Sequence, residues 1–260
     1  MKDQVDYDQI APKYDQRFDV EGPTITGLGL LQLIERLRPR SILEVGCGTG
    51  HWLELLEPLV ETVYGLDPSL AMLGQAHKGP RPSKLTLGVA EHLPFKDQSL
   101  EFVFCFNALH HFDAPRTFIR EAFRTLRPDG HIAVFGSDPR DAGGRESWYV
   151  YQYFDSTWET DLARFPSWNT VSDWMVEAGF RDVECWETER LVDPKQGRDV
   201  LNDPFLRKHS CSQLALLTDE EYAVGLRRIR TALRKAEAER TDIVFQTIVS
   251  HSVVLGEKNG

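Results

Sequence analysis

The stretch Leu43-Glu44-Val45-Gly46-Cys47-Gly48-Thr49-Gly50 decides the fold of this chain. An apolar run leads directly into three glycines that alternate with other residues, and an amphipathic stretch follows. Because glycine lets the backbone turn sharply and approach a ligand closely, we expect a strand, a glycine loop and a helix in succession. The common nucleotide fingerprint is G-x-G-x-x-G, whereas here the third glycine comes one residue early and His51 stands where the last glycine should be. The loop therefore predicts a nucleotide-like ligand and disfavours a pyrophosphate.

An acid follows the glycine loop at the end of the next apolar run. Asp67 comes 17 residues after Gly50 and directly after the expected strand 62–66. At the carboxyl end of a strand, a carboxylate can accept hydrogen bonds from both hydroxyls of a ribose. Asp67 could instead cap the helix that begins near Pro68-Ser69, and the two roles can coexist. The glycine loop and the acid together predict a site for a ribose-containing ligand.

Short apolar runs alternate with amphipathic stretches from Ser41 to Ser137, which is the pattern of parallel βαβ units. The strands expected in this part are 41–45, 62–66, 84–89, 100–106 and 131–137. Apolar residues at helical spacing predict a helix over 115–126, and Pro128-Asp129-Gly130 follows it as a tight turn. This part of the chain should form a parallel sheet covered by helices.

Two further strands are expected nearer the end of the chain. A helix over 171–178, closed by Gly179, leads into a strand at 182–187. The run 243–255 contains several β-branched residues and is also expected to be a strand.

Two segments, 138–168 and 192–240, interrupt this scheme. The second should contain two helices, the later of which begins at a capping box formed by Thr218 and Glu221. That helix carries a set of cations among acids, which favours a solvated surface: Arg227, Arg228, Arg230, Arg234 and Lys235. We interpret both segments as cap or lid insertions over the carboxyl ends of the strands, within a single domain of residues 1–260.

The composition disfavours several classes of protein. The 260 residues carry a formal net charge of -10, which argues against a nucleic-acid partner because such binding relies on clustered Lys and Arg. No apolar run approaches the ~18 residues that cross a bilayer, and the polar N-terminus does not resemble a secretory signal. The four cysteines lie far apart, so neither a disulfide framework nor a zinc site is indicated. We expect a cytoplasmic monomer or homodimer without a metal, nucleic-acid or membrane partner.

Five successive motifs resemble those of one enzyme family. They are Leu43 to Gly50, Gly65-Leu66-Asp67-Pro68-Ser69 with Met72, Ala90-Glu91-His92-Leu93-Pro94-Phe95, Leu109-His110-His111-Phe112 and Leu126-Arg127-Pro128-Asp129-Gly130. In this order they resemble the motifs of class I S-adenosylmethionine-dependent methyltransferases, in the branch of ubiquinone and menaquinone biosynthesis. The resemblance implies an α/β fold with a Rossmann-like, doubly wound sheet of seven strands, mostly parallel with an antiparallel last strand, plus helical cap insertions. It also implies methyl transfer from S-adenosylmethionine to a small, partly apolar molecule.

The resemblance also implies which residues contact the cofactor. They are Tyr14, Glu44, Gly46, Cys47, Gly48, Gly50, Asp67, Pro68, Met72, Ala90, Glu91 and Asn107. The glycine loop would face the methionine part and the ribose, while Glu44 would help to hold the amino group. Asp67 would bind the ribose hydroxyls, and Asn107 would lie near the methionine end. Tyr14 belongs to a segment, 7–15, that resembles the part of the family that folds over the cofactor.

The adenine end of this implied site departs from the family pattern. Pro68 and Met72 would lie beside the ring, and Ala90 with Glu91 would meet its edge. Many relatives carry an Asp just before the Ala-Glu pair, whereas this chain has Val89. Either Glu91 takes over the contact to the adenine amino group, or packing and main-chain groups hold the ring.

Methyl transfer from a sulfonium is an in-line displacement, so alignment is the main task of the protein. A general base helps if the acceptor is a hydroxyl, an amine or an enolisable carbon, and His is the usual choice. His110 and His111 follow the fourth strand and are the candidate catalytic residues, with His111 preferred from its place in the resemblance. One of them could instead pack against or cap the next helix. The aromatic residues over 148–174 could line the acceptor pocket or simply pack the cap.

Two other functions remain open from the sequence. A nicotinamide-dependent oxidoreductase would use a similar fold, but His51 in place of the final glycine disfavours it. A non-catalytic S-adenosylmethionine-binding protein, or the partner subunit of an active enzyme, would keep the same motifs.

Overall fold

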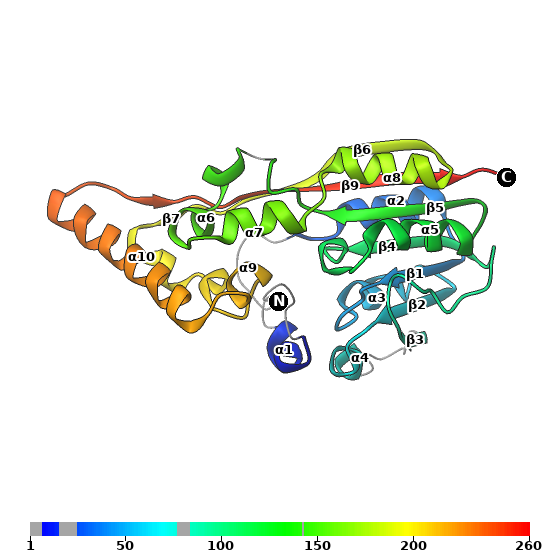
Figure 1. Cartoon of the computed structure of the whole chain (residues 1–260), viewed down its shortest axis with the longest axis horizontal. Coiled ribbons are helices and arrows are strands. Elements are labelled where there is room, and N and C mark those ends of the chain that lie inside the picture. The colour runs from blue at the N-terminus through cyan, green and yellow to red at the C-terminus, as the bar shows by residue number, and fades with distance from the viewer. Residues whose placement is uncertain (1–6, 16–24, 77–83, 142) are drawn as a thin grey trace.

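The computed structural model describes residues 7–15, 25–76, 84–141 and 143–260, without the side chains at positions 9, 12 and 13. A seven-stranded sheet runs through this part of the chain in the order β3-β2-β1-β4-β5-β9-β6 (Figure 1). The strands are β1 (Ser41–Val45), β2 (Thr62–Asp67), β3 (Lys84–Leu87), β4 (Leu100–Phe106), β5 (Leu126–Gly136), β6 (Phe180–Val192) and β9 (Ile248–Lys258). The strands β1 to β5 pair in parallel, and β9 is antiparallel to both β5 and β6. The expected seven-stranded α/β fold is confirmed.

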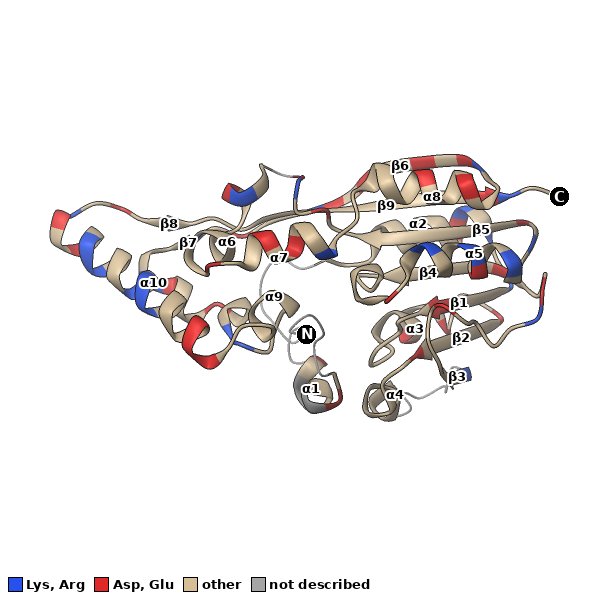
Figure 2. Ribbon diagram, viewed as in Figure 1, with Lys and Arg blue, Asp and Glu red and all other residues tan. Residues whose placement is uncertain are grey.

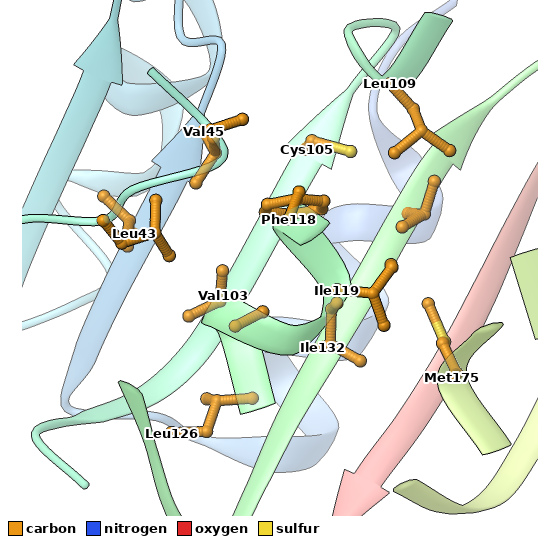
Figure 3. Close-up of a cluster of buried hydrophobic side chains, with 14 of the residues drawn as sticks. Leu43, Val45, Val103, Cys105, Leu109, Phe118, Ile119, Leu126, Ile132 and Met175 are labelled. Atoms are coloured by element: carbon orange, nitrogen blue, oxygen red, sulfur yellow. The ribbon is translucent and has the colours of Figure 1, made fainter. Parts of the chain in front are cut away.

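Helices cover both faces of the sheet because its strands alternate their side chains between two apolar cores. Phe102 and Phe104 of β4 pack in one core with α2 (Leu28–Leu37) and α3 (His51–Leu56). Val103 and Cys105 point to the other face and pack with α5 (Pro115–Thr125) and α8 (Trp168–Ala178). Figure 3 shows side chains from α5 and α8 meeting those of the strands in this second core. The period of two along β4 therefore makes the sheet doubly wound.

The start of β5 differs from the expectation. Leu126 was expected to end the helix, but α5 ends at Thr125 and Leu126 is already extended, pairing with Leu100 of β4. The register then shifts before His131 pairs with Phe102, and Asp129 between them has a φ of 62°. Pro128-Asp129-Gly130 therefore forms an irregularity inside a strand pairing, where the missing N–H of proline costs little.

The expected strand over 243–255 is interrupted. Val244–Phe245 (β8) pairs with Lys195–Gln196 (β7) in a separate two-stranded sheet, and β9 begins only at Ile248. Between them, Thr247 forms an isolated antiparallel bridge with Trp148. This junction joins the main sheet to the cap.

The described residues of 138–168 and 192–240 pack around a common core, and we call them the cap. It contains α6 (Tyr149–Tyr153), α7 (Thr157–Arg164), α9 (Ser212–Ala215) and α10 (Asp219–Glu239), with 3-10 turns at Gly144–Ser147, Gly197–Asn202 and Pro204–Leu206. The capping box of Thr218 and Glu221 at α10 is confirmed. A third apolar core holds these elements together, with Tyr149 and Ile229 fully buried in it. Since β9 runs away from the cap and is antiparallel to β5, the carboxyl ends of the parallel strands face the cap (Figure 1).

The surface of α10 carries both signs of charge (Figure 2). Arg198 pairs with Glu237 at 2.7 Å and Arg228 pairs with Asp155, so several of its charges are locally compensated. This mixture is typical of a solvated helix face. Within the described ranges, no helix has both the length and the apolar character that crossing a membrane requires.

Candidate functional site

The glycine loop joins β1 to α3 and has three residues in the left-handed region. Their φ angles are 78° at Gly46, 54° at Gly48 and 79° at Gly50. A Cβ on Gly46 would lie only 2.6 Å from the Cβ of Ala108, whereas one on Gly48 would have its nearest neighbour, in Tyr14, 3.9 Å away. The first glycine therefore permits close packing, and the middle one leaves room for a ligand.

Asp67 ends β2 beside this loop and is 8% exposed. Its Oδ2 accepts from the N–H of Gly48 at 2.8 Å, and its Oδ1 accepts from the N–H of Ser69 at 2.9 Å. The helix α4 (Leu70–Ala76) is N-capped by Ser69 rather than by Asp67. The Oγ of Ser69 accepts from the N–H of Met72 at 3.1 Å. Burial raises the pKa of Asp67, and the two backbone N–H groups partly oppose this shift. Asp67 thus fixes the loop and retains lone pairs for a ligand.

Glu44 lies within β1 and is only 1% exposed. Its Oε2 has no hydrogen-bond partner among the described residues. Burial, and then the charge of Asp67, raise the pKa of Glu44 well above its ordinary value. A buried carboxyl group with an oxygen that lacks a hydrogen-bond partner is suited to bind a cationic or hydrogen-bond-donating group of a ligand.

The residues predicted to lie beside the adenine ring line one cavity together with the glycine loop. Met72 is buried, whereas Val89 is 48% exposed. The Oε1 of Glu91 accepts from the N–H of Ala114, at the start of α5, at 2.9 Å. This bond orients the Glu91 carboxylate and leaves its other oxygen for a ligand, so the geometry is compatible with both ways of holding a ring.

Helix α1 (Tyr7–Tyr14) lies next to the glycine loop, at the carboxyl ends of the parallel strands. Ser69 Oγ donates to Asp8 Oδ1 and Thr49 Oγ1 donates to Asp15 Oδ1, both at 2.5 Å. Tyr7 and Tyr14 meet edge to face, with ring centroids 5.9 Å apart. The first of these bonds holds the described part of the N-terminal segment to the start of α4, and the second holds it to the glycine loop.

These groups enclose a cavity of about 430 Å³, which we call the loop cavity. It brings together most of the residues predicted to bind a cofactor: Tyr14, Glu44, Gly46, Cys47, Gly48, Asp67, Pro68, Met72, Ala90, Glu91 and Asn107. Gly50 does not line it; a Cβ on this residue would lie 3.0 Å from the Cβ of Ala76, so Gly50 faces α4. The sequence prediction did not include Asp8, Trp52 and Phe106, which also line it. Asp8 belongs to the segment 7–15 that the resemblance pointed to, whereas Trp52 and Phe106 lie in apolar runs that carry no local signal of such a role.

His110 and His111 lie in a 3-10 turn after β4, Leu109–His111. His111 lines the loop cavity, and its Nε2 is 2.7 Å from the hydroxyl oxygen of Tyr7. His110 does not line this cavity; its ring stacks on Phe165 with centroids 3.8 Å apart. Burial, His111 and Arg164 lower the pKa of His110 well below its ordinary value, so its imidazole is neutral and a weak base. Of the two candidates, the geometry favours His111.

A second cavity of about 270 Å³, which we call the cap cavity, lies between the cap and the sheet end. It shares six residues with the loop cavity: Tyr7, Tyr14, Trp52, Phe106, Asn107 and His111. Of the aromatic residues over 148–174, Trp148, Tyr151 and Phe165 line it, whereas Tyr149 and Phe154 pack in the core of the cap. Part of that aromatic segment therefore lines a cavity, and part of it packs the cap.

The chain matches known proteins over the part that builds this site. A family model described as a methyltransferase domain matches residues 43–134. The demethylmenaquinone methyltransferase of Geobacillus kaustophilus (strain HTA426) is 31% identical over 169 residues, covering 56% of this chain and 72% of that protein. The uncharacterized methyltransferase YcgJ of Bacillus subtilis (strain 168) is 31% identical over 140 residues, which cover 52% of this chain and 54% of YcgJ.

The crystal structure of YcgJ shares the fold, with a TM-score of 0.59 at 21% identity over 90% of this chain and 98% of that chain. The motifs, the fold and these relatives agree. The chain belongs to the S-adenosylmethionine-dependent methyltransferases.

Proposed function

We propose that this chain transfers a methyl group from S-adenosylmethionine to a small, partly apolar molecule. The observation that carries the proposal is the pair of adjoining cavities, one built on the glycine loop and one under the cap, with a shared wall that includes Asn107 and His111. A two-substrate transfer needs two binding sites that meet at the reacting atoms.

The residues of the loop cavity fit the cofactor. Glu44 offers a buried oxygen without a described partner, and Gly48 leaves open space where a side chain would otherwise project. Asp67 is oriented by two backbone N–H groups and can accept from hydroxyls. Glu44 would then face the amino group, Asp67 the ribose, and Met72 the adenine ring.

When bound, the cofactor supplies an electrophilic methyl group on a sulfonium. The chain itself has to bind and align the acceptor, exclude water and receive a proton if the acceptor carries one. Well-oriented reactants gain about 7 to 11 kcal/mol from positioning alone. His111 is the group proposed to receive the proton, because it lines both cavities and Tyr7 fixes its ring. Helix α1 would exclude water.

The first test is cofactor binding measured by calorimetry with S-adenosylhomocysteine. Asp67→Asn should weaken binding by about 10- to 100-fold, because it replaces charge-assisted hydrogen bonds of about 1.5–3 kcal/mol each with neutral ones. Asp242→Asn is the matched control, since Asp242 is exposed and lines neither cavity. Unchanged affinity in Asp67→Asn would contradict the assignment of Asp67, and a wild-type chain that does not bind S-adenosylhomocysteine would contradict the proposed function.

The second test is methyl transfer itself. Incubation with methyl-labelled cofactor and fractionated small molecules should label at least one product, which is then identified. Cofactor binding without labelling of any fraction would support the non-catalytic alternative, a cofactor-binding protein or partner subunit.

A further inference from the structure

Four residues that line the cap cavity each have a buried polar side-chain atom without a hydrogen-bond partner among the described residues. The atoms are Nε1 of Trp148, Oγ1 of Thr247, Oγ of Ser250 and Nδ1 of His251. The residues are 8%, 4%, 4% and 1% exposed. Buried polar groups are nearly always paired, so four such atoms at one cavity indicate a ligand.

Trp148, Thr247 and His251 lie along one wall of the cap cavity. Trp148 and Thr247 are opposite each other in the antiparallel bridge that joins the cap to the sheet. His251 follows Thr247 by four residues along an extended segment, so the two side chains project to the same side.

The contacts of His251 define what it offers to a ligand. Its Nε2 lies 3.1 Å from Oδ1 of Asn107, and its ring stacks on Phe106 with centroids 4.7 Å apart. Because an amide oxygen can only accept, Nε2 carries the ring proton and Nδ1 is a hydrogen-bond acceptor. Burial lowers the pKa of His251 to about 4, so the ring stays neutral at pH 7. Asn107 also lines the loop cavity, so it connects His251 to the cavity that would hold the cofactor.

The charges at the wall of the cap cavity limit the ligand further. Among the described residues that line it there is no Lys or Arg. Two acids do line it, Asp138 and Asp141, of which Asp138 is paired with Arg140 at 2.8 Å. An anionic ligand would therefore meet no Lys or Arg side chain on the described part of this wall, and its burial there would cost more than that of a neutral ligand. Aromatic walls, with Phe106, Trp148 and Phe165, suit a ring.

We infer that the cap cavity binds the methyl acceptor as an aromatic-ring molecule without negative charge, whose O–H or N–H donates to Nδ1 of His251. The indole N–H of Trp148 donates to an oxygen or nitrogen of the same molecule. This inference rests on the proposed function, since it assigns the second substrate of that reaction.

The test uses 2-naphthol as the probe, with 2-methoxynaphthalene and 2-naphthoate as comparisons, titrated into the chain saturated with S-adenosylhomocysteine. The naphthol should bind about tenfold more tightly than the ether, which lacks the donor, and more tightly than the anion. His251→Gln keeps an N–H for Asn107 but has no atom at the place of Nδ1, and it should remove the preference for naphthol over the ether. His251→Asn places an oxygen near that position and should restore part of it.

Thermal unfolding and cofactor affinity show whether each variant is folded, and His92→Phe, at an exposed residue outside both cavities, is the control. If the wild type does not bind S-adenosylhomocysteine, the proposed function fails. If it binds the cofactor but prefers 2-naphthoate, ignores 2-naphthol, or shows the same preference in His251→Gln, the inference alone is overturned.

Discussion

Two carboxylates in the loop cavity are held in different ways. Asp67 receives two backbone N–H groups, which compensate part of the cost of its burial. Glu44 is almost completely buried and keeps one oxygen without a described partner. The Asp67 carboxylate is therefore oriented before a ligand binds. Burial of the unpaired Glu44 oxygen costs free energy, which a ligand that donates a hydrogen bond would recover.

Cofactor binding should release a proton from Glu44. In the free chain, burial and Asp67 raise its pKa, so the group holds its proton at pH values where an ordinary Glu is ionised. A ligand ammonium favours the carboxylate, so affinity for S-adenosylhomocysteine should rise with pH until the free-state pKa is passed. Calorimetry in two buffers of different ionisation enthalpy measures the proton count.

Glu44→Gln is the control for that prediction. It should bind without proton release and about 10- to 100-fold more weakly, because a charge-assisted bond of about 1.5–3 kcal/mol is lost. With the raised pKa, ionisation of Glu44 destabilises the free fold as pH rises, so the free variant should be more stable than the wild type near neutral pH. Equal proton release in both proteins would contradict the assignment.

Residue-scale prediction from sequence succeeded where a residue belongs to a local motif. Asp67 follows a strand and a glycine loop within 25 residues, and the structure brings it to Gly48. His251 has no such signal, because it lies in the apolar run of β9, which pairs between β5 and β6. Its partner, Asn107, is 144 residues away in sequence, so only the tertiary fold reveals the pair.

At the scale of elements, the turn between β1 and α3 depends on backbone conformations that favour glycine. Gly46 has a positive φ, and a Cβ on it would lie only 2.6 Å from the Cβ of Ala108. Gly74, in α4, has the opposite setting, because a Cβ there would meet nothing within 4 Å.

Gly46→Ala and Gly74→Ala should therefore change stability in opposite directions. Gly46→Ala should lower the free energy of unfolding by about 1–3 kcal/mol through left-handed strain and the clash. Gly74→Ala should raise it by about 0.5–1 kcal/mol, since glycine is the poorer helix former. Urea unfolding of both variants measures the difference, and equal effects would show that the loop is not fixed as described.

The ends of elements were less predictable than their existence. The glycine loop, the capping box at Thr218 and the strand cores follow from local chemistry and were predicted. The early start of β5 at Leu126 was not, because pairing with Leu100 outweighs the helical pattern. The break before Ile248 was not either, because β-branched residues continue through it while the partner strand changes from β7 to β6.

At the scale of the whole molecule, the cap and the sheet have separate apolar cores. The two cores of the sheet lie on its two faces, and the third holds the cap alone. The loop cavity is built on the sheet and α1, whereas the cap cavity has walls from both parts. Cofactor binding and acceptor binding should therefore depend differently on the packing of the cap.

Ile229→Ala should separate these two functions. Ile229 lies in α10, is fully buried in the core of the cap and lines neither cavity. Its truncation should cost about 2–5 kcal/mol of packing. Because that loss falls on one core, hydrogen exchange should accelerate over Tyr149–Tyr153 and Asp219–Glu239 and stay slow over Leu100–Phe106. Affinity for S-adenosylhomocysteine should change less than twofold while binding of 2-naphthol weakens. Uniform acceleration across cap and sheet, with parallel loss of both ligands, would mean that the molecule unfolds as one cooperative unit.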